Sequence, residues 1–339
     1  MNPANRNALR SLQAVPSTRN PLRIALAIGD DARSRTLVTA LQSTLAQCDA
    51  RVAHESLPGS ESCGLSVALP REDAGNMGAL YRFRALAPLC KAHAHSMDLT
   101  IAADESGHTL SEPNARISSV SPSEQTIDLA CRYALQRGRQ GVSLVTHVEM
   151  SDGTRAFMQR MTSEFSVRYP ALTLNTLDAD DALYAMFKDA GSLDVLVSSP
   201  AIAQTLCAAA VNLANAADTA TVMRVRDQQC DVLPWRSTRA GDTPASLSAW
   251  IACVTECLLM LGRSRQALAL DNAWLATLEH GAQCGGVHLI SPYTSTLNAE
   301  AFADAVCLRL GERPQKVAQR LSPAQPAQPQ RLALVAMRH

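Results

Sequence analysis

LDVLVSSPAIAQTLCAAAVNLANA, residues 193–216, joins a short apolar run to a long alanine-rich run. The apolar run, 193–198, is bounded by turn residues and predicts a buried strand. Pro200 has a fixed φ that suits the first turn of a helix, and Ser199 is a candidate cap for that helix. The alanine-rich run predicts that the helix continues to about Asn215. This segment therefore predicts a strand, a tight turn and a helix in direct succession.

A second strand-to-helix unit lies near the start of the sequence. Residues 22–28, LRIALAI, predict a buried strand, and Gly29-Asp30-Asp31 turns it into a helix over 32–45. A strand that ends in Gly-Asp before a helix is a usual opening of a doubly wound α/β domain. Similar patterns predict strands at 65–69, 98–102, 142–150 and 172–177, and helices at 123–137, 154–169, 246–261 and 266–279.

The composition limits the kinds of partner that we expect. The chain has 339 residues, enough for one large or two ordinary domains. Its formal net charge of +0 argues against a broad surface for nucleic acid or an anionic membrane. No apolar run approaches the roughly 20 residues that a membrane span needs. We therefore expect neither a nucleic-acid nor a membrane partner.

The cysteines and the two ends of the sequence point to a cytoplasmic protein. The ten cysteines are dispersed, mostly in apolar segments, which is typical of buried free thiols in a reducing compartment. Cys90, His93 and His95 form a C-x2-H-x-H string that either binds a metal or alternates along a half-exposed strand. Residues 1–21 lack an apolar signal core and predict a flexible arm. Residues 313–339 predict a linker and an apolar tail, which either adds an edge strand or stays mobile.

The order of elements in the middle of the chain resembles that of a known enzyme family. Residues 123–172 read SEQTIDLACRYALQRGRQGVSLVTHVEM and then SDGTRAFMQRMTSEFSVRYPAL. In the isocitrate and isopropylmalate dehydrogenases, which are NAD(P)-dependent β-decarboxylating enzymes, this region reads roughly ERIARFAFELARKRGRKKVTAVHKAN and SDG-LFLEVAREVAKEYPDI. The resemblance spans about 22–312. It implies a two-domain α/β fold, with a large doubly wound sheet domain and an inserted smaller α/β domain.

The resemblance also implies where the domains lie. The large domain would comprise 22–101 and 237–312, and the smaller dimerisation domain would comprise 102–236, with a cleft between them. An alanine-rich helix such as 201–215 suits close packing between subunits.

The metal-binding positions of the family are altered in this chain. The family's strand-turn-helix reads roughly FDVIVT-x-N-L-F-GDILSD, and its two aspartates, four residues apart, hold a divalent cation. Gln204 and Ala208 stand at these positions, on one face of the predicted helix. Asp178 matches the third metal aspartate, which the other subunit supplies in the family's dimer. Because Mg²⁺ prefers carboxylate oxygens, we expect no metal cofactor.

The positions that carry catalysis in the family are altered as well. His147 stands at the family's catalytic lysine, and Glu149 at the asparagine that follows it. Ala103 and Asp104 replace the arginine and glutamate of the RENTEG motif, and His108 lies near its tyrosine. His147 is either an acid/base group or a strand-end histidine satisfied by its neighbours. His108 either titrates near neutrality or is an ordinary surface-loop histidine.

The substrate arginines of the family are not in register here. The family reads LRK-x-LDLYANVRP, whose arginines bind the substrate carboxylates. Tyr81 and Lys91 align with those arginines, and Arg82 and Arg84 lie nearby. Lys and Arg are not equivalent for forked carboxylate binding. Arg82 and Lys91 could form a weak substrate site; alternatively these cations form a solvated face.

The cofactor motif is also missing. The family wraps the adenosine of NAD with EPVHGSAPDIAGKGIANP. At 222–235 this chain reads VMRVRDQQCDVLPW, with Arg226-Asp227-Gln228 in the place of HGSAP. The resemblance therefore implies the fold of the family without its nicotinamide site.

We interpret the chain as a non-catalytic, regulatory or structural member of this family in tricarboxylic acid metabolism. It would form a homodimer, or a heteromer with an active NAD-dependent paralogue, and could bind a small di- or tricarboxylate. Two alternatives remain. One is an active NAD(P)-dependent oxidative decarboxylase of a 2-hydroxy-diacid such as isocitrate or 3-isopropylmalate. It would use His147, Asp104 and Asp178 with Mg or Mn and NAD. The other is a stand-alone sensor of carboxylate metabolites.

Overall fold

The structure, a computed structural model, describes the chain in separate ranges. These are residues 23–27, 39, 42, 51–54, 64–68, 76–86, 97–105, 121–147, 151–227, 229–235, 245–285 and 294–315. The strands are β1 Arg23–Ala27, β2 Arg51–His54, β3 Gly64–Ala68, β4 Asn76–Arg84, β5 Asp98–Ala103, β6 Gly141–Thr146, β7 Thr173–Asp178, β8 Val195–Ser198, β9 Thr221–Asp227, β10 Gln229–Pro234, β11 Ala282–Cys284 and β12 Ser295–Leu297. The helices are α3 Glu124–Gln136, α4 Asp152–Arg168, α5 Ala179–Asp189, α6 Pro200–Leu213, α7 Leu247–Met260, α8 Ser264–Glu279 and α9 Ala299–Leu308, with a short 3₁₀ helix, Ala190–Ser192.

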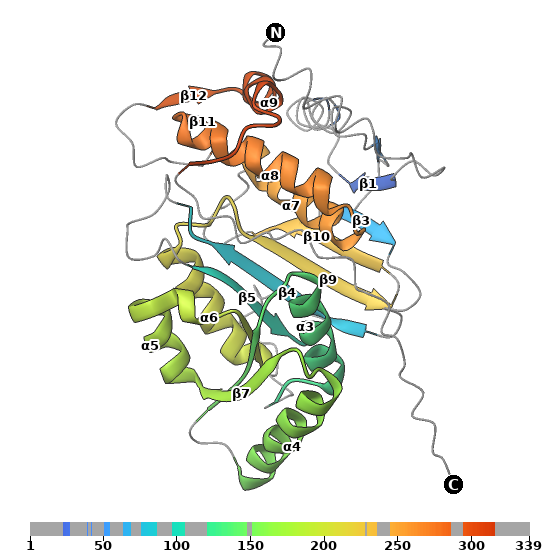
Figure 1. The fold of residues 1–339 in the computed structure, drawn as a ribbon, viewed down its shortest axis with the longest axis vertical. Coiled ribbons are helices and arrows are strands. Elements are labelled where there is room, and N and C mark those ends of the chain that lie inside the picture. The colour runs from blue at the N-terminus through green and yellow to red at the C-terminus, as the bar shows by residue number, and fades with distance from the viewer. Residues whose placement is uncertain are drawn as a thin grey trace, which may run out of the picture.

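Within the described ranges, ten strands form one mixed sheet (Figure 1). Their order is β2-β1-β3-β10-β9-β4-β5-β8-β6-β7. The pairs β1–β2, β5–β8, β8–β6 and β6–β7 are parallel, and the strands from β1 through β3, β10, β9 and β4 to β5 pair antiparallel. A parallel block therefore forms one end of the sheet, and an antiparallel block forms its middle.

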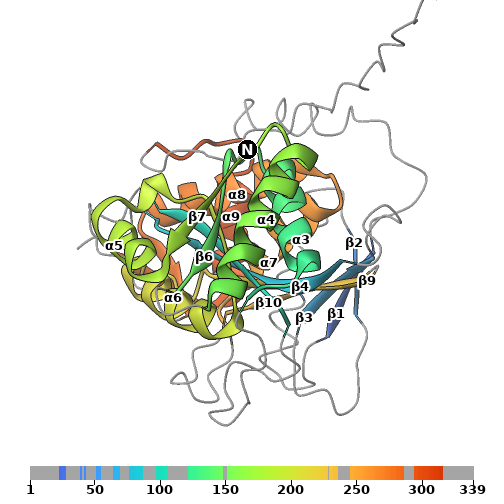
Figure 2. The same ribbon diagram turned by 90° about the horizontal axis from the view of Figure 1, so that it is seen from below.

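Helices cover both faces of the parallel block (Figure 2). Helices α3 and α4 pack on one face, and α5 and α6 pack on the other. Strands β5 and β8 are buried along their whole length. A strand covered on both faces reads as a continuous apolar run rather than an alternating one. The doubly wound α/β arrangement predicted from the sequence is therefore present.

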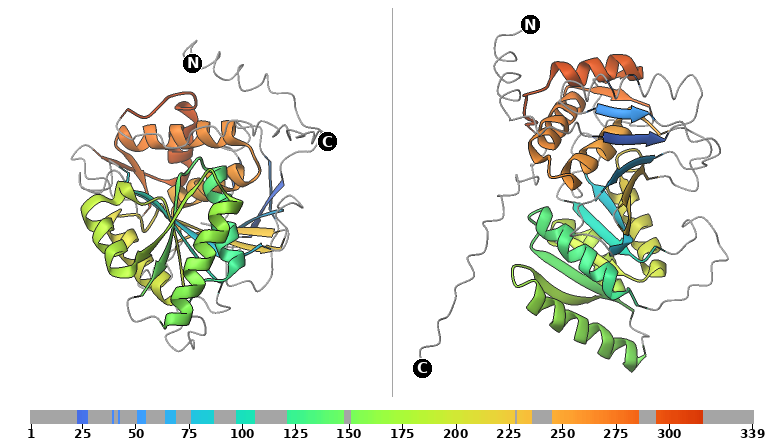
Figure 3. Two further views of the ribbon diagram at one scale, coloured as in Figure 1. Left: turned by 60° about the horizontal axis from the view of Figure 1, so that its bottom comes forward. Right: turned by 90° about the vertical axis from the view of Figure 1, so that its right-hand side faces the viewer.

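A second group of helices covers the antiparallel block. Helix α7 packs against β3, β9 and β10, α8 packs on α7, and α9 packs on α8 beside the small β11–β12 sheet. Figure 3 shows these orange and red helices at one end of the molecule and the green helices α3–α5 at the other. Trp274 and Phe302 are fully buried between the C-terminal helices and fill this part of the core.

The local signals in the sequence explain several helix ends. Ser123 caps α3, because its side chain accepts a hydrogen bond from the Thr126 amide. Pro200 occupies the first turn of α6 and Ser199 the cap position, although Ser199 makes no side-chain capping bond. Gly138 has a φ of 63° directly after the end of α3, a conformation that favours glycine. The predicted start of α6 at Ser199 and Pro200 is confirmed.

Two parts of the sequence interpretation need correction. The segment 222–235 is not an adenosine-wrapping loop, because it forms the antiparallel strands β9 and β10. These strands lie between β3 and β4, so one sheet contains strands from both of the predicted domains. The domain boundaries themselves remain a prediction. The helix α5, Ala179–Asp189, was not predicted. The predicted helix over 32–45 lies almost wholly outside the described residues, as do Cys90, His93 and His95.

The cysteines that the structure describes are free, and most are buried. Cys253 and Cys257, one helical turn apart on α7, are both completely buried in the core. Burial raises the pKa of each of these thiols. None of the helices in the described ranges combines the length and the apolarity that a membrane crossing needs.

Close packing between α3 and β4 generates a first prediction. A Cβ atom at Gly78 would lie 2.9 Å from Thr126 Oγ1 and 3.1 Å from a methyl carbon of Leu129. We expect Gly78→Ala to lower the free energy of unfolding by about 1–3 kcal/mol, measured by urea denaturation, because the helix must shift. Gly153→Ala is the control, since its Cβ would meet only Ser151 Oγ at 3.9 Å. Equal stability of the two variants would contradict the packing.

Candidate functional site

The carboxyl ends of the parallel strands bring together most of the predicted site positions. Asp104 follows β5, His147 follows β6, and Asp178 ends β7. The helix α6 begins just after β8 and carries Gln204 and Ala208 one turn apart. Because parallel strands end at one edge of a sheet, these positions share that edge, where ligands bind in open α/β folds. His108, Lys91 and Glu149 lie outside the described residues.

Two acidic side chains among the predicted site positions, Asp104 and Asp178, are engaged at helix N-termini. Asp104 accepts hydrogen bonds from the Ser123 amide at 3.1 and 3.0 Å and from Thr126 Oγ1 at 2.6 Å. Asp178 accepts a hydrogen bond from the Asp180 amide at 2.9 Å, which caps α5. A carboxylate at a helix N-terminus satisfies unpaired amides and is stabilised by the helix dipole.

The described residues at this edge do not fit a divalent metal. Gln204 and Ala208 are exposed on one face of α6 and provide no carboxylate. Among the described residues, no group of three or more His, Cys, Asp or Glu side chains is placed to hold a metal ion. His147 is exposed at the end of β6.

An ion pair between two non-adjacent strands lies at the same edge. Arg226 Nε donates a hydrogen bond to Glu105 Oε2 at 2.7 Å, and its Nη2 pairs with Glu105 Oε1. Arg224 Nε lies 3.8 Å from Glu105 Oε1. The sequence carried a signal for this pair, because VMRVRD alternates apolar and polar residues as a strand does. The family comparison had assigned that segment to a loop instead.

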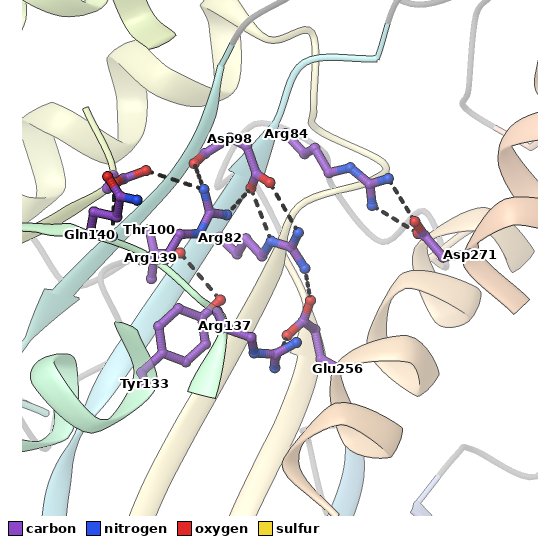
Figure 4. A network of polar contacts seen from close by, with 11 residues as sticks. Arg82, Arg84, Asp98, Thr100, Tyr133, Arg137, Arg139, Gln140, Glu256 and Asp271 are labelled. Atoms are coloured by element: carbon purple, nitrogen blue, oxygen red, sulfur yellow. Dashed lines mark hydrogen bonds and ion pairs between the residues drawn. The ribbon is translucent and has the colours of Figure 1, made fainter. Parts of the chain in front are cut away.

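The opposite edge of the sheet holds a buried network of ion pairs (Figure 4). Arg82 on β4 is 5% exposed and contacts two carboxylates. Its Nε lies 3.3 Å from Asp98 Oδ1 on β5, and its Nη1 pairs with Glu256 Oε1 on α7. Arg137 Nη2, at the end of α3, donates to Glu256 Oε2 at 2.6 Å. One arginine therefore links strand β5 to helix α7.

A third arginine, Arg139, extends the network to β8. Arg139 Nη2 lies 2.7 Å from Asp98 Oδ1, and its Nη1 donates to the Asp98 carbonyl at 3.0 Å. The same guanidinium lies 3.4 Å from Asp194 Oδ1. Asp194 Oδ2 accepts hydrogen bonds from the amides of Gln140 and Gly141 at 3.3 and 3.2 Å. The network therefore fixes the starts of β5, β6 and β8 relative to one another.

Arg84 anchors α8 at the same edge. Its two terminal nitrogens donate to the two oxygens of Asp271, each at 2.8 Å. A cavity of about 20 Å³ lies between this pair and Glu256, lined also by Thr219 and Thr221. Ligand pockets are usually about 300 Å³ or larger, so this space is too small for a metabolite. We conclude that this edge is built for structure.

The electrostatics of the network favour the charged forms of Asp98, Glu256 and Arg82. Burial disfavours charge on Asp98, but Arg82 and Arg139 outweigh it and hold the pKa of Asp98 well below its usual value. Burial likewise opposes charge on Glu256, and Arg137 and Arg82 lower its pKa. Burial would lower the pKa of Arg82, but Asp98 and Glu256 raise it.

The geometry separates Arg82 from the other predicted site positions that the structure describes. In the register of β4 and β5, the backbone of Arg84 lies opposite Asp98 at the start of β5. The backbone of Ala79 lies opposite Ala103 at the end of β5, next to Asp104. Arg82 therefore lies toward the edge opposite to Asp104 and His147. The alternative that Arg82 and Arg84 form a solvated face is also wrong, because both guanidiniums are paired with buried carboxylates.

Comparisons with known proteins agree with this fold. No protein-family model matches the chain. A 198-residue segment, 58% of this chain and 41% of the relative, is 20% identical to the isocitrate dehydrogenase [NADP] of Rickettsia bellii (strain RML369-C). The crystal structure of isocitrate dehydrogenase from Methylococcus capsulatus superposes with a TM-score of 0.64 at 16% identity, covering 85% of this chain and 99% of that one. The TT0538 protein from Thermus thermophilus gives a TM-score of 0.59 at 14% identity, covering 90% of this chain and 73% of that one.

These similarities define the class to which the fold belongs. The chain has a mixed α/β fold of the isocitrate/isopropylmalate dehydrogenase type. The sequence match spans about two fifths of the length of its curated relative. The resemblance identified from the sequence is therefore confirmed for fold and for part of the sequence.

The buried network generates a second prediction. Glu256→Gln removes the charge that Arg82 and Arg137 share inside the protein. We expect the free energy of unfolding to fall by about 3 kcal/mol or more, measured by urea denaturation, since a buried cation loses its counter-charge. Glu164→Gln on α4 is the matched control, because Glu164 pairs with Arg160 on the surface and should contribute about 0.5 kcal/mol or less. A loss for Glu256→Gln no larger than for the control would contradict the network.

A third prediction concerns acid stability. The pKa of Asp98 and that of Glu256 are lower in the folded than in the unfolded chain, so their contribution is present above about pH 4. It is lost as the pH falls toward the folded values, because the unfolded chain binds the protons first. We expect urea denaturation to show stability falling below about pH 4, less steeply in Asp98→Asn. An identical slope in both proteins would exclude Asp98 as a source.

Proposed function

We propose that this chain is a non-catalytic protein with the isocitrate/isopropylmalate dehydrogenase-like fold, which regulates or supports an active paralogue. The observation that carries the proposal is the carboxyl edge of the sheet. The two positions of the family's metal aspartates hold Gln204 and Ala208, and the retained Asp178 caps α5. Without that set of carboxylates, a metal-assisted oxidation of a hydroxy-diacid loses the group that would bind and polarise the substrate.

The sequence between β10 and α7 supports the proposal. Between β10 and α7 the chain reads WRSTRAGDTPAS, residues 235–246, and contains no HGSAP. Neither this segment nor the hairpin before it carries the cofactor motif. A protein that has lost both the metal carboxylates and the cofactor motif is better suited to a regulatory or structural task than to hydride transfer.

The surface of α5 supports a role in pairing. Tyr184 and Phe187 stand three residues apart on α5 and are 63% and 61% exposed. Large exposed apolar side chains on one helix face are typical of a surface that another protein covers. Helix α6 lies beside α5 and is rich in alanine, which permits close approach. We propose that this surface pairs with a second copy or with an active NAD-dependent dehydrogenase of the same fold.

An active enzyme is the second candidate. Asp104, His147 and Asp178 all lie at one edge of the sheet. Two of the three similar proteins reported above are named isocitrate dehydrogenases. The test is formation of reduced dinucleotide from isocitrate or 3-isopropylmalate with NAD⁺ or NADP⁺ and Mg²⁺. Turnover that His147→Ala abolishes would establish the enzyme. Our proposal predicts no turnover by the chain alone and altered kinetics when it co-purifies with an active dehydrogenase.

The altered metal positions generate a fourth prediction. Gln204 and Ala208 are exposed one turn apart on α6, so carboxylates there would face the same side. We expect the double variant Gln204→Asp with Ala208→Asp to bind Mn²⁺ in titration calorimetry and the unaltered chain to give no heat. The single variant Gln204→Asp is the control and should bind more weakly. Equal Mn²⁺ binding by the unaltered chain would overturn the proposal.

A further inference from the structure

Two arginines share one face of β9 beside the carboxyl edge of the parallel strands. Along this strand, Val222 packs into the core on the α6 side, and Met223 and Val225 pack on the α3 side. Since side chains alternate along a strand, Arg224 and Arg226 point to the α6 side. Their Cα atoms are about 7 Å apart, two residues along the strand. The two guanidiniums therefore form a cationic pair on one surface.

The register places Glu105 opposite this pair. Ala79 on β4 pairs with Ala103 on β5 and with Arg224 on β9, so these three residues form one row. Met77 pairs with Arg226 in the next row, and Glu105 lies two residues beyond Ala103. Strand β4 lies between β9 and β5. Because Ala79 and Ala103 have small side chains, the arginine side chains of β9 and the side chain of Glu105 can reach one another across β4.

The two arginines differ in how far their hydrogen-bonding capacity is used. Arg226 binds both oxygens of Glu105, whose side chain is 13% exposed. Arg224 lies 3.8 Å from the same carboxylate, too far for a hydrogen bond. Within the described part of the chain, the side chain of Arg224 makes no hydrogen bond, although it is 30% exposed and has five N–H donors. Arg224 therefore has donors available to a ligand.

Tyr81 adds a polar group beside the pair. It lies two residues from Ala79 on β4, on the same face of the strand. Burial raises the pKa of Tyr81, and the nearby charges of Arg224 and Glu105 act on it in opposite directions. Its hydroxyl therefore stays protonated at neutral pH. Asp231 on β10 stands directly opposite Arg224 in the strand register, and its charge acts on Arg226. The surroundings thus contain two cations, one protonated phenol and two carboxylates, Glu105 and Asp231.

We propose that Arg224 and Arg226 form a binding site for a di- or tricarboxylate, and that Glu105 is an internal carboxylate that competes for it. A planar guanidinium binds a carboxylate through two parallel hydrogen bonds, which is how Arg226 holds Glu105. A ligand binds Arg224 with one carboxylate and displaces Glu105 from Arg226 with another. The inference rests on the carboxylate ligand expected for the proposed regulatory function, and it supplies the residues that bind that ligand.

Competition by Glu105 gives opposite signs for two substitutions. Glu105→Gln keeps the size of the side chain and removes the competing charge, so the affinity for the ligand should rise about tenfold. Arg224→Gln removes the cation with free donors, so the affinity should fall at least about tenfold. A glutamate that only holds the arginines in place would give the reverse result for Glu105→Gln, because the arginines would lose their orientation.

The experiment is calorimetric titration of the full chain with isocitrate, repeated with 3-isopropylmalate and with sulfate. Glu164→Gln and Arg160→Gln are the controls, because they alter an exposed pair of the same kind on α4. Urea denaturation shows whether each variant is folded. Isocitrate binding that strengthens in Glu105→Gln, weakens in Arg224→Gln and is unchanged in the controls supports the proposal.

Three results would overturn it. These are sulfate binding as tight as isocitrate, weaker binding in folded Glu105→Gln, and the absence of isocitrate binding to the unaltered chain. The last result leaves the non-catalytic assignment standing, because that assignment is tested by turnover and by Mn²⁺ binding. Conversely, turnover by the chain would overturn the assignment, while the response of affinity to Glu105→Gln would still decide the site.

Discussion

The arrangement of the helices on the sheet depends on one buried guanidinium. Arg82 lies between Asp98 on β5 and Glu256 on α7, two residues that belong to different parts of the sequence. A buried charge without a partner costs several kcal/mol, so every member of this network constrains the others. Arg137 and Arg139 bring in the end of α3 and the start of β8. An alternative packing of α7 would take Glu256 away from Arg137 and leave Arg82 with Asp98 alone.

The two edges of the sheet differ in role: the buried ion pairs lie at one edge, and the predicted site positions lie at the other. The amino ends of β5, β6 and β8 are fixed by ion pairs in the interior, and the adjoining cavity is too small for a metabolite. The carboxyl ends carry Asp104, His147 and the pair formed by Glu105 and Arg226. Because the ion pairs hold the sheet and helices together at the amino ends, residues at the carboxyl ends can be substituted without loss of the fold. The fold is therefore compatible with the altered metal and cofactor positions, because neither contributes to the network.

The sequence predicted the elements that periodicity and caps mark, because these are local signals, but it missed α5, β4, β9 and β10. The run 193–198, Pro200 and Ser123 each identify a strand or a helix end without tertiary information. The partners of Arg82 could not be predicted, since Glu256 lies 174 residues away and only the fold brings them together. The hairpin of β9 and β10 was missed because a family motif was given more weight than the alternation of VMRVRD. The same choice hid Arg224 and Arg226 as candidate ligands.

Loss of dinucleotide binding is the central claim, and calorimetric titration of the purified full chain with NAD⁺ and NADP⁺ tests it most directly. The measurement needs no partner, no substrate and no assumption about the metal. Absence of binding heat with either dinucleotide, in a preparation that unfolds cooperatively in urea, is the result we predict. Micromolar binding of either one would contradict the non-catalytic assignment and would favour an oxidative decarboxylase that uses His147.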